Sequence, residues 1–152
     1  MTIPLGLNMP CPKEFEHLPH TADVIVVGYG ETLEEAFANA AKGVFAVITD
    51  VKKVEPKECR EVEDEADDLE QALYKWIDDL LLYFDSEGLV FSKFEVKLEK
   101  KEGKYLIKGR ACGELFDPEK HEYGTIVKAM TYAEMKIEKV GDCWRVQFVV
   151  DI

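Results

Sequence analysis

No stretch of this sequence approaches the roughly 20 consecutive apolar residues with which a helix crosses a bilayer. The beginning of the chain, Met1 to Cys11, is mildly apolar but has no basic n-region, so it does not match a signal peptide. These absences argue against a membrane protein and against a secreted one. We therefore expect a soluble, cytoplasmic protein.

Closely spaced cysteines are also missing. The four cysteines stand far apart without a C-x-x-C pair, at Cys11, Cys59, Cys112 and Cys143. A zinc site needs closely spaced ligand pairs, so this spacing argues against zinc. We expect the cysteines to be reduced and mostly buried, with a Cys112–Cys143 bridge only if their strands are neighbours. The Glu- and Lys-rich composition fits a thermophile, in which intracellular disulfides do occur.

Basic side chains are few and do not form a clear cluster. The chain carries 31 acidic against 19 basic side chains, which gives a formal net charge of -12. Nucleic-acid binding depends on Lys and Arg displacing counterions from phosphates, and a surface this acidic repels RNA and DNA. A role in nucleic-acid metabolism would therefore act through a protein partner, and a basic partner would associate fastest.

Signatures of common enzyme classes are absent as well. The sequence has no G-x-S-x-G, no P-loop, no Rossmann fingerprint and no H-E-x-x-H. Two acidic pairs, Asp67-Asp68 and Asp78-Asp79, look like paired catalytic acids. In helices such pairs usually cap the N-terminus or face solvent, and we interpret them in this way.

What the sequence does contain is typical of one globular domain. With 47% hydrophobic and 33% charged residues in 152, the chain can bury a hydrophobic core. Two amphipathic helices are predicted. The first begins with a capping box at Thr32-Leu33-Glu34-Glu35 and continues to about Ile48. The second begins after Asp67 or Asp68 and ends at Gly88.

β-Branched and alternating segments predict the strands. They are a short strand at 15–18 before a turn at Pro19-His20, a buried strand at 23–30, a charged edge strand at 59–65, and two hairpins that pair 94–100 with 105–113 and 127–139 with 143–152. The predicted fold is α+β, a single domain in which two helices pack on a mixed or antiparallel sheet.

The last predicted strand carries two carboxylates to the end of the chain. Its alternating apolar residues must be buried on one face, which fixes its register as far as Ile152. The side chain of Asp151 and the main-chain carboxylate of Ile152 would then lie together and repel one another, unless a cation, a lysine or solvent separates them. Hard cations such as Ca²⁺ or Mg²⁺ prefer such oxygen ligands. The alternative is two acids that simply face water.

Two further segments place polar residues where chemistry could occur. The first, His20-Thr21-Ala22-Asp23, precedes the buried strand, although turn and capping roles are the common alternative there. The second contains His121 in a polar loop and Lys128 at the start of the next predicted strand. Lys128 would share a strand face with Tyr132 and could simply be solvated. A single histidine without a partner does not define a site.

Seven short motifs follow one another from about Phe15 to the end of the chain. They are H-T-A-D at 20–23, T-L-E-E-A-F at 32–37, D-D-L at 67–69, G-E at 113–114, K-H at 120–121, V-K-A-M-T-Y at 127–132 and the terminal V-D-I. In this order they resemble the archease family, small protein partners of the RtcB-type tRNA-splicing ligase. Residues 1–14 lie outside the pattern as an N-terminal extension, and 15–152 form the archease-like domain.

The resemblance implies a non-catalytic activator of that ligase, without turnover of its own. Such a protein promotes guanylylation of the ligase, widens its nucleotide use and supports multiple turnover when tRNA exon halves are joined. The resemblance also implies a calcium-type site formed by Asp23, Asp151 and the terminal Ile152, for Ca²⁺ or another hard cation such as Mg²⁺ or Mn²⁺. Candidates for contact with phosphate or the partner are His20, His121 and Lys128. We expect no direct nucleic-acid binding.

Two other classes of function stay open. A metal-dependent hydrolase could use the same carboxylates, but it would normally show a base or nucleophile beside the metal, and none is evident. A general chaperone would act through exposed apolar surface, and the sequence shows no long exposed apolar stretch.

Overall fold

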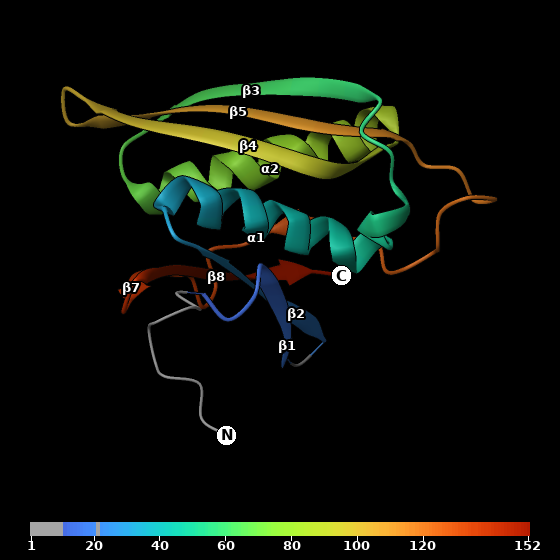
Figure 1. Cartoon of the computed structure of the whole chain (residues 1–152), viewed down its shortest axis with the longest axis horizontal. Coiled ribbons are helices and arrows are strands. Elements are labelled where there is room, and N and C mark those ends of the chain that lie inside the picture. Colours follow the sequence, from blue (N-terminus) through green and yellow to red (C-terminus); the bar gives the residue numbers. More distant parts are fainter. Residues whose placement is uncertain (1–10, 21) are drawn as a thin grey trace.

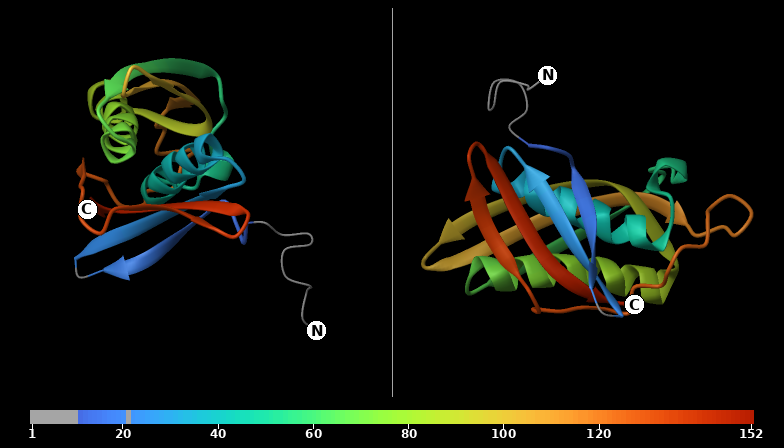
Figure 2. Two further views of the ribbon diagram at one scale, coloured as in Figure 1. Left: turned by 90° about the vertical axis from the view of Figure 1, so that its left-hand side faces the viewer. Right: turned by 90° about the horizontal axis from the view of Figure 1, so that it is seen from below.

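The chain folds into three layers, with both helices lying between two antiparallel β-sheets (Figures 1 and 2). The computed structural model describes residues 11–20 and 22–152, so that Thr21 of the first motif and residues 1–10 of the predicted extension lie outside the described part. The α+β prediction is confirmed. The strands are divided between two sheets rather than joined in one, because the helices present apolar side chains to both sides.

The first sheet has the last strand at its centre. Its strands are β1 (Phe15–His20), β2 (Asp23–Gly30), β6 (Ala129–Met130), β7 (Lys136–Val140) and β8 (Cys143–Asp151). The order is β1-β2-β8-β6, and β7 also pairs with β8. Strand β8 is therefore hydrogen-bonded along both of its edges, which satisfies its backbone groups and holds it in place.

Two predictions for this sheet are wrong in detail. Strand β1 continues through His20, so Pro19 and His20 belong to the strand and not to a turn, and Ala22 just before β2 has a φ of 61°. The predicted strand 127–139 is interrupted between β6 and β7, and Glu134 in this interval has a φ of 54°. Lys128 and Tyr132 therefore do not share a strand face.

The second sheet consists of β3 (Glu58–Ala66), β4 (Leu89–Lys101) and β5 (Lys104–Leu115), in the order β3-β5-β4. Strand β3 is at the edge, as its charged sequence predicts. The long β4–β5 hairpin turns at Glu102-Gly103, where both residues have positive φ.

The two helices begin and end close to the predicted residues. Helix α1 spans Leu33–Ile48, and α2 spans Leu69–Glu87; a short 3-10 turn, Val51–Lys53, follows α1. Asp68 caps α2, and Gly88 ends it in the left-handed conformation. None of the helices in the described part of the chain is long and apolar enough to span a membrane.

Close contacts explain how the layers fit together. A Cβ on Gly28 would lie 2.5 Å from the Ala40 backbone nitrogen, so glycine lets α1 pack directly on β2. Between the helices, the buried indole N–H of Trp76 donates to the carbonyl oxygen of Phe37 at 3.0 Å. A polar group buried without such a partner would cost about 1–3 kcal/mol.

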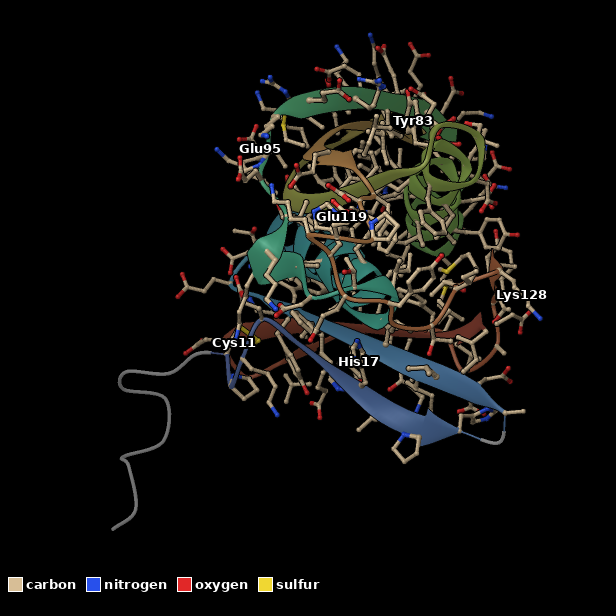
Figure 3. All side chains as sticks on the ribbon, turned by 90° about the vertical axis from the view of Figure 1, so that its right-hand side faces the viewer. Cys11, His17, Tyr83, Glu95, Glu119 and Lys128 are labelled. Carbon is tan, nitrogen blue, oxygen red and sulfur yellow. A yellow bond between two sulfur atoms is a disulfide. The ribbon has the colours of Figure 1, made fainter. Side chains whose placement is uncertain are left out.

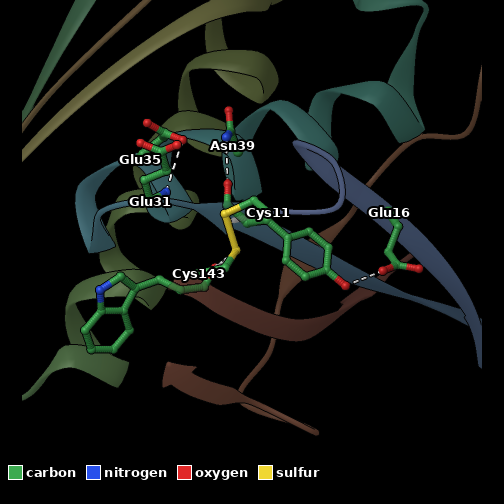
Figure 4. Close-up of a disulfide and its surroundings, with 8 residues drawn as sticks. Cys11, Glu16, Glu31, Glu35, Asn39 and Cys143 are labelled. Carbon is green, nitrogen blue, oxygen red and sulfur yellow. Dashed lines mark hydrogen bonds between the residues drawn. A yellow bond between two sulfur atoms is a disulfide. The ribbon is translucent and has the colours of Figure 1, made fainter. Parts of the chain in front are cut away.

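The four cysteines form two disulfides, so the prediction of reduced cysteines is wrong. Cys59 and Cys112 lie directly opposite one another on β3 and β5, with their Cα atoms 4.0 Å apart. Cys11 is bonded to Cys143 at the start of β8, with a Cα–Cα distance of 5.2 Å (Figure 4). A Cys112–Cys143 bridge does not form, because these two cysteines belong to different sheets.

Candidate functional site

Strand register brings two predicted cation ligands together. Asp23 begins β2 and Asp151 ends β8, and the two residues are direct partners in the antiparallel pair. Opposed residues in such a pair have Cα atoms about 4.5–5.5 Å apart and side chains on the same face. Two carboxylates therefore lie side by side where the strands end. We call His20, Asp23, Asp151 and Ile152 the tip.

The end of β8 is held firmly. The backbone N–H of Lys128 donates to the carbonyl oxygen of Asp151 at 2.8 Å, and β2 pairs with the other edge. Val150 is fully buried just before Asp151, and half-buried Ile152 packs against the core. Because both edges and the apolar face are engaged, we expect little fraying at this end.

His20 joins the tip through the neighbouring strand. It ends β1 directly opposite Asp23, and its Nδ1 lies 3.5 Å from the Asp23 Oδ2. The side chains of His20 and Asp23 are 38% and 29% exposed, so both are accessible from solvent. Three adjacent strands thus contribute one polar group each to the same end of the sheet.

The main chain of Lys128 contacts the tip. Its backbone bonds to Asp151, while its exposed side chain extends from the surface of the molecule (Figure 3). An exposed ammonium group of this kind can attract an anionic group such as a phosphate.

His121 belongs to a separate, buried cluster. Its Nδ1 accepts the backbone N–H of Asp117 at 2.8 Å, and its Nε2 lies 3.1 Å from Glu114 Oε2. This pairing requires the neutral tautomer with the proton on Nε2, which donates to the carboxylate. Because the side chain of His121 is fully buried and both ring nitrogens are used, His121 is placed to hold the loop after β5 and not to contact the tip.

Glu114 is the centre of this second cluster. Lys120 Nζ lies 2.8 Å from Glu114 Oε2, and the backbone N–H of Glu55 donates to the same oxygen at 2.7 Å. Burial raises the pKa of Glu114, but hydrogen bonds from Lys120, the Glu55 amide and His121 outweigh it and lower the pKa to about 2. The G-E and K-H motifs are thus two halves of one cluster, whereas nothing in the sequence indicates the contribution of Glu55.

Comparison with known proteins identifies the family. The model of the Archease protein family matches residues 15–152. The chain belongs to the archease family. It is 55% identical to Protein archease of Thermococcus kodakarensis over 141 residues, which covers 92% of this chain and 99% of the relative. It is 56% identical to Protein archease of Aeropyrum pernix over 137 residues, 90% of this chain and 95% of the relative.

Solved structures of archease relatives share the fold. The solution structure of protein 1598 from Methanobacterium thermoautotrophicum is 39% identical, has a TM-score of 0.81 and covers 91% of this chain and 99% of that one. The crystal structure of an archease, described as a possible chaperone, from Thermotoga maritima has a TM-score of 0.56, covers 89% of this chain and 94% of its own, and is 23% identical, so it shows the fold alone.

The oxygen atoms of the tip supply some, but not all, of the ligands that a hard cation needs. Carboxylate oxygens are the ligands that Ca²⁺ and Mg²⁺ prefer, and Ca²⁺ takes six to eight of them. Across residues 11–20 and 22–152, no group of three or more His, Cys, Asp and Glu side chains is arranged to hold a metal ion. A cation between Asp23 and Asp151 therefore needs main-chain oxygens, such as the carboxylate of Ile152, or water as further ligands.

A second pair of acids lies between β3 and α2. Asp79 is partly buried beside Asp64, so the predicted solvated role holds for Asp78 and not for Asp79. Burial, together with a hydrogen bond to Asp64 and its charge, raises the pKa of Asp79 to about 7. A carboxyl group protonated near neutral pH is a poor cation ligand, so we do not include this pair in the candidate site.

Proposed function

We propose that this chain is a non-catalytic activator of an RtcB-type 3′-phosphate tRNA-splicing ligase. It promotes guanylylation of the ligase, widens the nucleotides that the ligase accepts and supports multiple turnover. The observation that carries the proposal is the direct opposition of Asp23 and Asp151 at a firmly held sheet end. The net charge of -12 supports action through a protein, because an acidic surface repels RNA.

The tip is the part that enters the active site of the ligase. Asp23, Asp151 and the main-chain carboxylate of Ile152 would hold a divalent cation there, Ca²⁺ or another hard cation such as Mg²⁺ or Mn²⁺. A bound divalent cation supplies charge compensation for the phosphates of the nucleotide. The chain itself contributes the positions of the carboxylates, because strand pairing fixes their geometry before the partner arrives.

The residues around the carboxylates have supporting roles in this proposal. His20, 3.5 Å from Asp23, orients that carboxylate from the neighbouring strand. Lys128 is exposed beside Asp151 and contacts a phosphate or an acidic group of the partner. We assign no partner contact to His121, because both of its ring nitrogens are used within the fold.

A ligase assay under multiple-turnover conditions tests the proposal. We expect the wild-type chain to raise the number of turnovers, and Asp23→Ala and Asp151→Ala to lose most of this effect while keeping the fold. Asp142→Ala is the matched control, since Asp142 is an exposed acid in the turn at the start of β8. Full activation by Asp151→Ala, or substrate turnover by the chain alone, would contradict the proposal.

A general chaperone is the second candidate, and one observation favours it. Leu115, Tyr123 and Ile126 are exposed by 59%, 76% and 56%, which the sequence does not predict. Exposed apolar side chains can bind unfolded clients. This function predicts suppression of aggregation for several unrelated proteins, with no dependence on Asp151. If the chain protects no unrelated client, the chaperone alternative is wrong.

A further inference from the structure

An apolar groove lies at the end of the molecule where both helices finish. Its cavity has a volume of about 480 Å³ and is formed by the last turns of α1 and α2 together with the loop after β5. Its apolar lining comes from Ile48 and Phe84 in the helices and from Leu115, Phe116, Tyr123 and Ile126 around the loop. We call this feature the groove.

The walls of the groove expose an unusual share of large apolar side chains. Leu115, Tyr123 and Ile126 account for three of the six large hydrophobic residues that are exposed in the described part of the chain. Apolar surface in contact with water is unfavourable, and exposed apolar patches of this kind mark interaction sites. The sequence shows no apolar run here, because the three residues are separated along the chain.

The groove is already formed before anything binds. The backbone N–H groups of Gly124 and Thr125 each donate at 2.9 Å to carbonyl oxygens at the end of α1, and Phe116 donates to Gly88 at 2.8 Å. The rings of Phe116 and Tyr123 meet edge to face, 5.1 Å apart. The Glu114 cluster holds the middle of the same loop. Because little has to be ordered on binding, the entropic cost of occupying the groove is small.

The exposed charge in the loop that forms the groove is negative. Glu87 is the charged residue among those that line the groove in the described part of the chain, and its carboxylate is paired with Arg60 at 2.8 Å. Glu119 and Glu122 are exposed in the same loop, and Figure 3 shows Glu119 at this end of the molecule. Lys120 is turned toward Glu114 and Glu55. The complementary occupant is an apolar side chain flanked by Lys or Arg.

The groove and the tip are close enough for one partner to contact both. Ile126 lies two residues before Lys128, which corresponds to at most about 7 Å of chain. Lys128 in turn donates its backbone N–H to Asp151 at 2.8 Å. In Figure 1 the C-terminus lies near the end of α1, whose last residue, Ile48, lines the groove.

We propose that the groove receives an apolar side chain, flanked by Lys or Arg, from the same ligase that receives the tip. This inference rests on the proposed function and adds a second contact to it. The groove supplies affinity through apolar burial, while the carboxylates of the tip act at the active site. The two contacts can therefore be separated by mutation.

Binding of an RtcB-type ligase to the purified chain tests the inference. Ile126→Asp and Leu115→Asp each place a charge on the groove wall at an exposed position, and we expect each to raise the Kd by at least about tenfold. Leu82→Asp is the matched control, because Leu82 is 62% exposed on α2 but does not line the groove. Thermal unfolding of each variant verifies that the fold is intact.

The outcomes separate the two proposals. Wild-type affinity in both groove variants would overturn the inference and leave the proposed function standing. Absence of any binding by the wild-type chain would overturn both. Concentration-dependent dimerisation that Ile126→Asp abolishes would assign the groove to a second copy of the chain, and the inference would again be wrong.

Discussion

Asp23 at the start of β2 and Asp151 at the end of β8 lie directly opposite one another, although 128 positions of sequence numbering separate them. Both side chains are accessible to solvent. Two carboxylates this close repel one another, and a cation bound between them would relieve this repulsion. The relief of repulsion contributes to the free energy of cation binding.

Removing one carboxylate should abolish cation binding without weakening the fold. We expect Ca²⁺ or Mn²⁺ to raise the Tm of the wild-type chain and to leave that of Asp151→Asn unchanged, because ligand binding stabilises only a protein that binds it. In the absence of cation, Asp151→Asn should be more stable by a few tenths of a kcal/mol, since a repulsion is removed. Differential scanning calorimetry measures both effects. Equal Tm shifts in both proteins would contradict the assignment.

Extending the chain should separate activation from folding. Addition of Gly-Ser after Ile152 moves the main-chain carboxylate away from Asp151 but leaves all side chains in place. We expect loss of ligase activation with an unchanged Tm. The matched control is the same Gly-Ser extension in an Asp151→Ala background, which should cause no further loss. An extended chain with full activity would show that Ile152 contributes no ligand.

Loss of the Glu114 carboxylate should destabilise the loop after β5. Glu114→Gln removes the ion pair with Lys120 and weakens two further hydrogen bonds, so we expect a loss of about 1–3 kcal/mol in the free energy of unfolding. Glu114 holds the loop that forms one wall of the groove through Lys120 and His121, so ligase binding should weaken as well. Urea unfolding measures the stability, with Glu119→Gln, an exposed acid in the same loop, as the control.

Glu114 should also make the stability of the wild-type protein depend on pH in the acid range. The pKa of Glu114 is about 2 in the fold, against 4.5 for an ordinary glutamate. Since the unfolded chain binds the proton more readily, this contribution to stability is present above about pH 4.5 and is lost as the pH falls toward 2. Glu114→Gln should lose this part of the pH dependence, and an unchanged profile would contradict the assignment.

Asp79 should make the stability of the protein depend on pH in the opposite direction. Burial and the neighbouring Asp64 raise its pKa to about 7 from an ordinary value of 3.8. The folded chain therefore holds the proton more tightly, and stability falls as the pH rises from about 4 to 7. Asp79→Asn should be more stable than wild type at pH 8, because a neutral amide removes the repulsion between residue 79 and the Asp64 carboxylate. Equal unfolding free energies at pH 8 would contradict this.

Local signals in the sequence predicted the helices and most strands. The Thr32 hydroxyl accepts the backbone N–H of Glu35, as a capping box requires, although the Glu35 carboxylate accepts from Glu31 and not from the cap residue itself. The left-handed Gly88 is also as predicted, and Val146, Phe148 and Val150 of β8 are buried as expected, but Gln147 and Val149 on the opposite face of this strand are buried too. These features depend on residues that are close together in the sequence, so they can be predicted from a single sequence.

Features that depend on distant contacts could not be predicted in the same way. The break between β6 and β7 contains neither Gly nor Pro, and it forms because Val149 bonds to Ala133 and Gln147 to Glu134 across the sheet. Likewise, the burial of His121 depends on Glu114 at the end of another segment. The pairing of Asp23 with Asp151 needed the family resemblance, since their strands are far apart in the chain.

The bond between Cys11 and Cys143 closes most of the chain into a covalent ring. A protease cut in any loop between these two residues would leave two pieces that remain one molecule until a reductant is added. The loop that forms the groove lies inside the ring, whereas Asp151 lies beyond Cys143 and is held by strand pairing and by the packing of its neighbours Val150 and Ile152. After such a cut, we expect the two pieces to separate only when a reductant breaks the Cys11–Cys143 bond.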